Sequence, residues 1–126
     1  MLIPHLHFCG NCAEAIALYE QAFGTKTDIL FLNGNGDDSV GHAEMLIHGA
    51  RVMLNDRFGK KGKTADCAVS LIVTFKSAVE LLACYEKLRP GGIVIDQPEK
   101  LSYTELGLQF MDRFGVQWGF MVEGSV

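Results

Sequence analysis

The sequence lacks both an excess of positive charge and a long apolar run. Its 11 Lys and Arg residues are outnumbered by 15 Asp and Glu, so the net charge is −4 and the pI is about 5.5. A nucleic acid or an anionic membrane surface requires a basic face, so both classes of partner are disfavoured. No apolar stretch reaches about 18 residues, and no charged start precedes one, so neither membrane spanning nor export is indicated. We therefore expect a cytoplasmic protein that binds neither nucleic acid nor membrane.

The four cysteines offer little support for a redox site. Cys9 and Cys12 have the spacing of a dithiol motif just before a predicted helix, where the helix dipole favours a thiolate. Cys12, however, falls on the apolar stripe of that helix, Cys84 lies within a second predicted helix, and Cys67 begins a predicted strand. We therefore expect small buried residues and reduced thiols rather than a catalytic pair.

What the sequence does contain is one structural unit written twice. Residues 4–49 can be laid on residues 70–115 without a gap, at an offset of 66. Asn11 then falls on Ser77, and each is followed three residues later by a glutamate, an arrangement typical of helix starts. Two units that each leave an apolar face open must pack together, so we predict a single domain over 1–126, with a first half 1–60 and a second half 66–126.

The predicted elements follow the same order in both halves, which gives an α+β class with two β-α-β-β-β units. Apolar residues at helical spacing predict one helix after Asn11, ended by Gly24, and another after Ser77, ended by 90–92. Residues 4–8 open the first copy as a strand. Short segments rich in branched and aromatic residues predict further strands at 29–32, 40–48, 52–54, 69–73, 93–95, 106–111 and 116–122.

Several motifs give the chain a family resemblance. They are the opening segment 3–15, then Tyr19, Phe23-Gly24, 42–44, 54–56 and 112–118. Together with the repeated unit they resemble the vicinal oxygen chelate superfamily, which includes glyoxalase I, extradiol dioxygenases and the bleomycin and fosfomycin resistance proteins, and within it the PhnB-like (3-demethylubiquinone 3-methyltransferase-like) subgroup. The resemblance implies eight strands curved into a half-open barrel, commonly in a homodimer, with a small-molecule ligand in the concave cavity.

The same resemblance implies where a metal would be held. Metal-dependent members take ligands from inward positions on the first and last strands of each half, which matching by motif places at Pro4, about Met53, Ala68 or Ser70, and Gly119. None of these residues supplies a carboxylate or an imidazole, so we expect no metal and no cofactor. A methyltransferase function is the weakest alternative, because no glycine-rich nucleotide loop follows a strand.

Alternation along the strands predicts the polar lining of the cavity. His42 and Glu44 share one strand face, opposite an apolar set, and the same alternation adds Arg51, Asn55 and Gln117 to the lining. We predict His42 and Glu44 as a catalytic acid/base pair, and Arg51, Asn55 and Gln117 as ligand-binding residues. The alternative is that His42 and Glu44 are solvent-facing strand residues.

His5 and His7 also share a strand face. Parity with Pro4 puts them toward the helices as structural histidines, although a register shift of one residue would reverse that placement.

Two functions remain open from the sequence. The first is metal-free binding of a small polar or aromatic metabolite or antibiotic in the cavity. The second is an enzyme, a lyase, isomerase or group-transfer catalyst, that uses His42 and Glu44 or a metal held by atypical ligands. In either case each half offers an open sheet edge, so we expect a homodimer.

Overall fold

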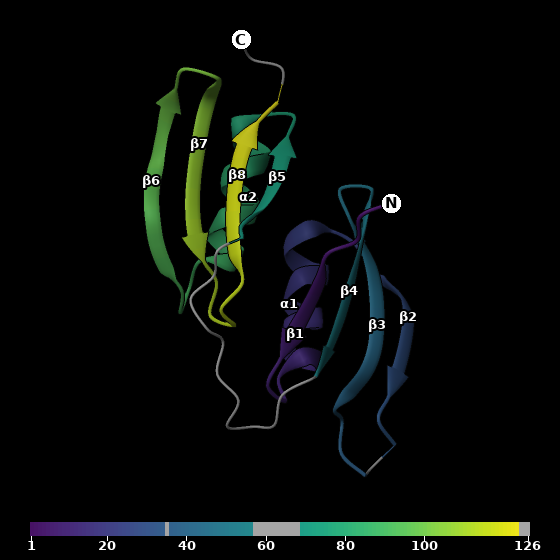
Figure 1. The fold of residues 1–126 in the computed structure, drawn as a ribbon. Helices are drawn as coiled ribbons and strands as arrows, with labels where there is room; N and C mark the ends of the chain where they lie inside the picture. The colour runs from purple at the N-terminus through teal and green to yellow at the C-terminus, as the bar shows by residue number, and fades with distance from the viewer. Residues whose placement is uncertain (35, 57–68, 124–126) are drawn as a thin grey trace. The chain divides into compact units, whose positions relative to one another are not determined.

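The structure is a computed structural model that describes residues 1–34, 36–56 and 69–123. The chain divides into two compact units, Met1–Ala65 and Asp66–Val126, and each is described by itself. Both units have the order strand, helix and three strands (Figure 1), which confirms the α+β class and the repeated unit. The single domain over 1–126 remains a prediction.

Unit 1 is a four-stranded sheet with one helix. Its elements are β1 (His5–Phe8), α1 (Cys12–Phe23), β2 (Thr27–Leu32), β3 (Val40–Ile47) and β4 (Ala50–Asp56). The strand order is β1-β4-β3-β2, with β1 parallel to β4 and the other neighbours antiparallel. β2 is therefore an edge strand.

Unit 2 repeats this topology. Its elements are β5 (Leu71–Phe75), α2 (Ala78–Leu88), β6 (Ile93–Leu101), β7 (Thr104–Met111) and β8 (Gln117–Val122), with strand order β5-β8-β7-β6. The described strands thus form two separate open sheets, and neither closes into a barrel. The half-open barrel concerns both units together and remains a prediction. β4 runs longer than predicted because it pairs with β3 at its start and with β1 at its end, and β6 because its irregular pairing with β7 continues to Leu101.

In each unit the helix covers one face of the sheet, and the apolar core lies between them. The buried residues of α1 are Cys12, Ala15, Ile16 and Tyr19, and those of α2 are Leu81, Cys84, Tyr85 and Leu88. Facing strand residues include Met45 and Leu54 in unit 1 and Phe110 and Phe120 in unit 2, all buried. Each large apolar side chain contributes about 1.5 to 3 kcal/mol on burial. We call the opposite side of each sheet its open face.

The two helices begin differently. Ser77 caps α2 as predicted, since its Oγ accepts a hydrogen bond from the amide of Glu80 at 3.2 Å. The predicted side-chain cap by Asn11 is wrong, because Asn11 Oδ1 accepts from the amide of Cys9 instead. The start of α1 is held by Asp56, whose Oδ1 accepts from the amides of Gly10 (2.8 Å) and Cys12 (3.0 Å). A carboxylate from the end of β4 therefore replaces the local cap.

The gapless repeat is correct for the helix starts and the last strands and wrong by one residue elsewhere. Leu6 pairs with Leu54, and Val73 pairs with Phe120. Leu54 and Phe120 are 66 residues apart, but Leu6 and Val73 are 67 apart, because the link from strand to helix is one residue shorter in unit 2. By the corresponding pairings with β4 and β8, the structural counterparts in β3 and β7 are 65 apart.

This shift corrects the predicted placement of His5 and His7. They pair with Met53 and Asn55 and lie on the open face, while Phe8 is buried on the helix side. The prediction was wrong because parity was counted from Pro4, which precedes the strand. The structure thus places two imidazoles on the face where the polar lining was expected.

Candidate ligand-binding site

The open face of unit 1 carries a connected charged network. Arg51 on β4 donates to both carboxylate oxygens of Asp28, at 3.1 and 2.9 Å, and to Glu44 Oε1 at 3.0 Å. The second oxygen of Glu44 is 2.7 Å from His42 Nε2. The predicted face of His42, Glu44 and Arg51 is therefore the observed one, and the three side chains touch. Whether they act on a ligand stays a prediction.

The electrostatics of this network favour the ionised forms. The hydrogen bond from His42 lowers the pKa of Glu44, and the hydrogen bond and charge of Arg51 lower it further against a desolvation cost. Arg51 likewise lowers the pKa of Asp28, chiefly by its hydrogen bond. Each charged group of the network thus has a partner within it. The network links side chains of β2, β3 and β4 on the open face.

The histidines of this face form a second group. His7 Nδ1 lies 2.8 Å from Asn55 Oδ1, within hydrogen-bond distance. The His5 ring lies 4.3 Å from the His7 ring and 6.4 Å from the His42 ring, measured between centroids. Asn55 therefore orients an imidazole on this face, a role that required the corrected register.

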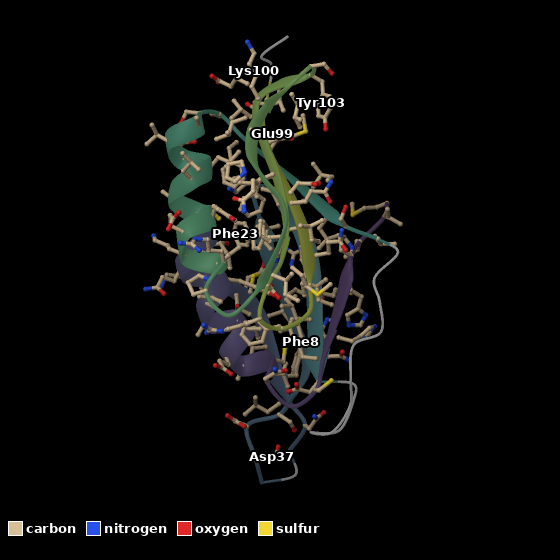
Figure 2. The ribbon with its side chains drawn as sticks, turned by 90° about the vertical axis from the view of Figure 1, so that its left-hand side faces the viewer. Phe8, Phe23, Asp37, Glu99, Lys100 and Tyr103 are labelled. Carbon is tan, nitrogen blue, oxygen red and sulfur yellow. The ribbon has the colours of Figure 1, made fainter. Side chains whose placement is uncertain are left out.

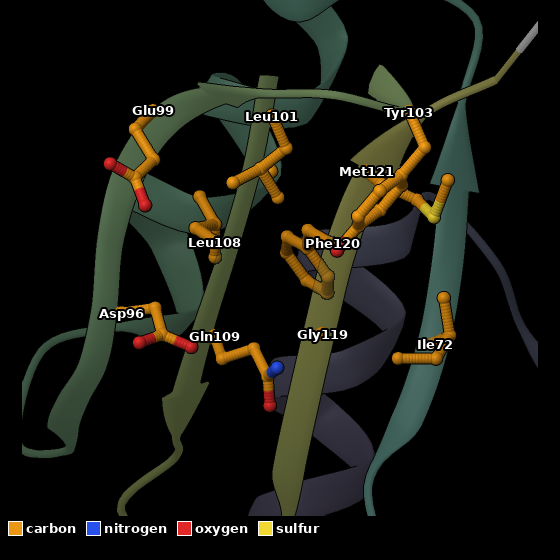
Figure 3. A pocket seen from close by; sticks show the side chains of 11 residues that line it. Ile72, Asp96, Glu99, Leu101, Tyr103, Leu108, Gln109, Gly119, Phe120 and Met121 are labelled. Atoms are coloured by element: carbon orange, nitrogen blue, oxygen red, sulfur yellow. The ribbon is translucent and has the colours of Figure 1, made fainter. Parts of the chain in front are cut away.

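The remaining predicted residue, Gln117, lies in unit 2. Its side-chain amide donates to Gln109 Oε1 at 3.4 Å across the β7–β8 pair. Gln109 in turn lines a hollow on the open face of unit 2, with a volume of about 200 Å³. The lining residues are Ile72, Asp96, Glu99, Leu101, Tyr103, Gly107, Leu108, Gln109, Gly119, Phe120 and Met121 (Figure 3). Gln117 thus does not line the hollow itself but contacts Gln109, which does.

Two glycines leave room for this hollow. A Cβ built on Gly119 would come within 2.6 Å of Ile72 Cδ1, and one on Gly107 within 2.7 Å of Leu101 Cδ1. Any larger side chain at these positions would displace an apolar wall residue and occupy the floor. The missing side chains on β7 and β8 therefore give the sheet a depression instead of a flat face.

A strand irregularity brings two carboxylates to the same hollow. Asp96 pairs with Gln109 and Glu99 pairs with Gly107, and the register shifts between Asp96 and Glu99. Strict alternation would put residues three apart on opposite faces of a strand, whereas a bulge lets both line one face. Sequence reasoning missed Asp96 and Glu99 for this reason. Gln109 carried a usable signal, because it alternates with the apolar Leu108 and Phe110 on the predicted strand 106–111.

The family's metal positions do not fit a metal ion here. The structure moves the inward position on the first strand from Pro4 to His5 or His7, but the partner positions are Met53, Ser70 and Gly119, and Ala68 lies outside the described residues. Among residues 1–34, 36–56 and 69–123, no group of three or more His, Cys, Asp or Glu is arranged to hold a metal.

The thiols at the helices are unsuited to nucleophilic chemistry. Burial, aided by the charge of Asp56, raises the pKa of Cys12 to about 12, and burial raises that of Cys84 to about 12. Both therefore remain protonated near neutral pH. This agrees with the expected small buried residues, while Cys67 lies outside the described residues.

Comparisons with known proteins identify the family. The model of the Glyoxalase/Bleomycin resistance protein/Dioxygenase superfamily matches residues 2–120, so the chain belongs to this superfamily. Protein YjdN of Escherichia coli (strain K12) is 23% identical over 137 aligned positions, which cover 93% of this chain and 91% of YjdN.

Solved structures show the same fold. Protein PA1353 from Pseudomonas aeruginosa has a TM-score of 0.87 at 24% identity, covering 99% of this chain and 98% of its own. The PhnB protein from Bacillus cereus has a TM-score of 0.84 at 23% identity, covering 96% and 98%. These neighbours confirm the glyoxalase-like fold and the resemblance to PhnB-like proteins. In the described part of the chain, no helix is long and apolar enough to cross a membrane, and the cytoplasmic location stays a prediction.

Proposed function

We propose that this protein binds a small molecule in the hollow on the open face of unit 2, without a bound divalent metal. The observation that carries the proposal is a cavity of about 200 Å³ whose floor is made by two glycines and whose walls combine polar and apolar side chains. Ligand sites typically join apolar walls with a few placed polar groups. Membership of a superfamily named after enzymes and resistance proteins supports the same class of function.

The test is a fragment screen followed by mapping of amide shifts by NMR. We expect bound fragments to shift the resonances of Gln109, Gly119 and Met121 and to leave those of α2 unchanged. Gly119→Met, which places a side chain on the floor, should weaken binding at least tenfold, roughly the loss of one well-placed contact of 1.4 kcal/mol. The matched control is Ala83→Met on the exposed side of α2.

Failure of the screen has a defined meaning. If Gly119→Met does not fold, Gln109→Ala provides a second variant that removes a wall group without adding bulk. Fragments that bind equally well to the wild type and to both variants would refute the hollow as the site. Shifts confined to unit 1 would favour the second candidate below.

The second candidate function is catalysis at the open face of unit 1. The contact of 2.7 Å between His42 and Glu44 is the geometry of an oriented imidazole, and a positioned His–carboxylate pair can move a proton near neutral pH. A lyase, isomerase or group-transfer reaction would use it. The test is to measure turnover on a substrate panel with wild type, His42→Ala and Glu44→Ala, and with Cys9→Ser/Cys12→Ser as control. Activity lost only in the cysteine variant would rule out the His–Glu pair.

We also propose that two chains associate. The edge strands expose large apolar residues, namely Leu30, Phe31 and Leu32 on β2 and Ile93, Val94 and Ile95 on β6. Unpaired apolar edges are usually covered in native proteins. Light scattering at micromolar concentration should give the mass of a dimer, and a monomer mass would contradict the proposal.

A further inference from the structure

Two carboxylates line the hollow of unit 2 without a partner of their own. Asp96 and Glu99 are exposed on β6, and neither carboxylate takes part in a hydrogen bond or ion pair with any described residue. Lys100 follows Glu99 directly, but its side chain points away from the β6–β7 hairpin at its tip (Figure 2). In the described part of unit 2, no lysine or arginine therefore forms an ion pair with either carboxylate.

The lining of the hollow is divided into a polar and an apolar side. Asp96 and Glu99 lie on one side, and Ile72 and Met121 on the other, with Gln109 at the lower end (Figure 3). Tyr103 lies on the apolar side and adds an aromatic ring next to Met121. A molecule that fills the hollow thus meets acceptors at one end and carbon at the other.

Gln109 adds a neutral polar group between the two sides. Its Oε1 accepts one hydrogen bond from Gln117 and can accept a second, and its amide nitrogen can donate. The hollow is thus a cavity with two unpaired carboxylates beside one amide, not merely an acidic patch on a flat surface.

From this arrangement we propose that the ligand of the hollow carries a positively charged nitrogen, such as an ammonium or amidinium group, attached to an apolar or aromatic body. The inference rests on the proposed function and deepens it. The charged nitrogen lies between Asp96 and Glu99, and the apolar body lies against Ile72 and Met121. A ligand with a carboxylate in the same place would meet two like charges.

The experiment uses three probes that share a phenyl ring and differ in charge: phenethylamine, phenethyl alcohol and 3-phenylpropionate. Each is titrated into the full-length protein and followed by amide shifts in unit 2. We expect the amine to bind about two- to fivefold more tightly than the alcohol, the range for exposed ion pairs, and the carboxylate not to bind. Higher salt should weaken the binding of the amine and leave the binding of the alcohol unchanged.

Charge variants locate the effect. Asp96→Asn and Glu99→Gln should each remove most of the preference for the amine while leaving the alcohol affinity unchanged. Glu86→Gln, which removes the same charge from the exposed side of α2, is the matched control and should keep the preference.

Each outcome decides between the two proposals. If the alcohol or the carboxylate binds in the hollow as tightly as the amine, the inference about charge is overturned and the small-molecule site survives. If none of the three probes shifts a residue of the hollow, both proposals fail. If the amine is preferred but Glu86→Gln removes the preference as strongly as Asp96→Asn, the preference reflects net charge and the inference is overturned.

Discussion

Equivalent positions on the open faces of the two units carry charged side chains in unit 1 and neutral ones in unit 2. Through their strand pairing, Glu44 and Arg51 of unit 1 correspond to Gln109 and Gln117 of unit 2. The first pair is an ion pair at 3.0 Å, and the second is a neutral hydrogen bond at 3.4 Å. In unit 1 the polar side chains of the open face therefore pair with one another, whereas in unit 2 a neutral hydrogen-bonded pair lies beside a hollow.

The difference in shape arises at two other matched positions. His42 and Met53 in unit 1 correspond to Gly107 and Gly119 in unit 2. On the edge strands, Ile29 pairs opposite Glu44, where unit 2 pairs Asp96 opposite Gln109. Glycines open the face of unit 2 and acidic residues border it, so one duplicated scaffold carries a closed polar network in one copy and an accessible cavity in the other.

The largest expected effect is at the buried aspartate that follows β7. Asp112 is 3% exposed and accepts from the amides of Phe114 and Val116 and from the indole of Trp118. Asp112→Ala leaves these donors unsatisfied and should lower the free energy of unfolding by about 2 to 4 kcal/mol.

Denaturant titration followed by the fluorescence of Trp118, the one tryptophan of the chain, measures this loss in unit 2. Asp112→Asn keeps an acceptor and should lose less. Asp56, which is only half-buried, serves as the unit 1 comparison, and Asp56→Ala should cost less than Asp112→Ala. Equal losses of stability at the two aspartates would show that the deeper burial of Asp112 does not increase its contribution.

Alkaline pH should weaken both units through their buried thiols. In the folded protein the pKa values of Cys12 and Cys84 are about 12, against an ordinary value of 9.0. Their contribution to the free energy of unfolding is therefore complete below pH 9 and is lost as pH rises toward 12. Each thiol should account for about 1 kcal/mol of lost stability between pH 9 and about pH 10. Denaturation of wild type and Cys12→Ala at both pH values measures it; an unchanged pH slope in the variant would contradict the assignment.

A smaller effect is expected when Met53 of unit 1 is replaced by glycine, the residue at the equivalent position 119 of unit 2. Met53→Gly should reduce stability by about 1 kcal/mol, because glycine weakens a strand interior and removes apolar contact. It should not create binding of phenethylamine, because Asp28, the carboxylate of the edge strand β2, is already held by Arg51. Amide shifts in unit 1 on titration with the amine would show that space alone is sufficient.

The smallest effect concerns the ion pair of unit 1. The lowered pKa of Glu44 means that its contribution is present above the ordinary value of 4.5 and is lost as pH falls through the folded value. Glu44→Gln should therefore melt slightly lower than wild type near neutral pH and equally in acid. A melting difference that persists at acidic pH would assign the effect to packing instead of charge.

The sequence predicted the fold through patterns that depend only on neighbouring residues. Helical spacing located α1 and α2, and alternation placed His42, Glu44 and Arg51 on one sheet face, where the structure finds them in contact. It failed where the outcome depends on register. Parity counted from Pro4, which precedes β1, put His5 and His7 on the wrong face, and the irregular pairing of β6 hid Asp96 and Glu99.

The sequence by itself determined the class of fold, the repeat, the helix starts and the apolar side of each sheet, because these follow from the order and periodicity of side chains along the chain. The tertiary structure alone decided which strand residues lie opposite one another, and therefore that Asp56 holds the start of α1 and that Gly107 and Gly119 line the same hollow. The physical reason is that strand pairing joins residues distant in sequence, and a shift of one residue moves a side chain to the other face.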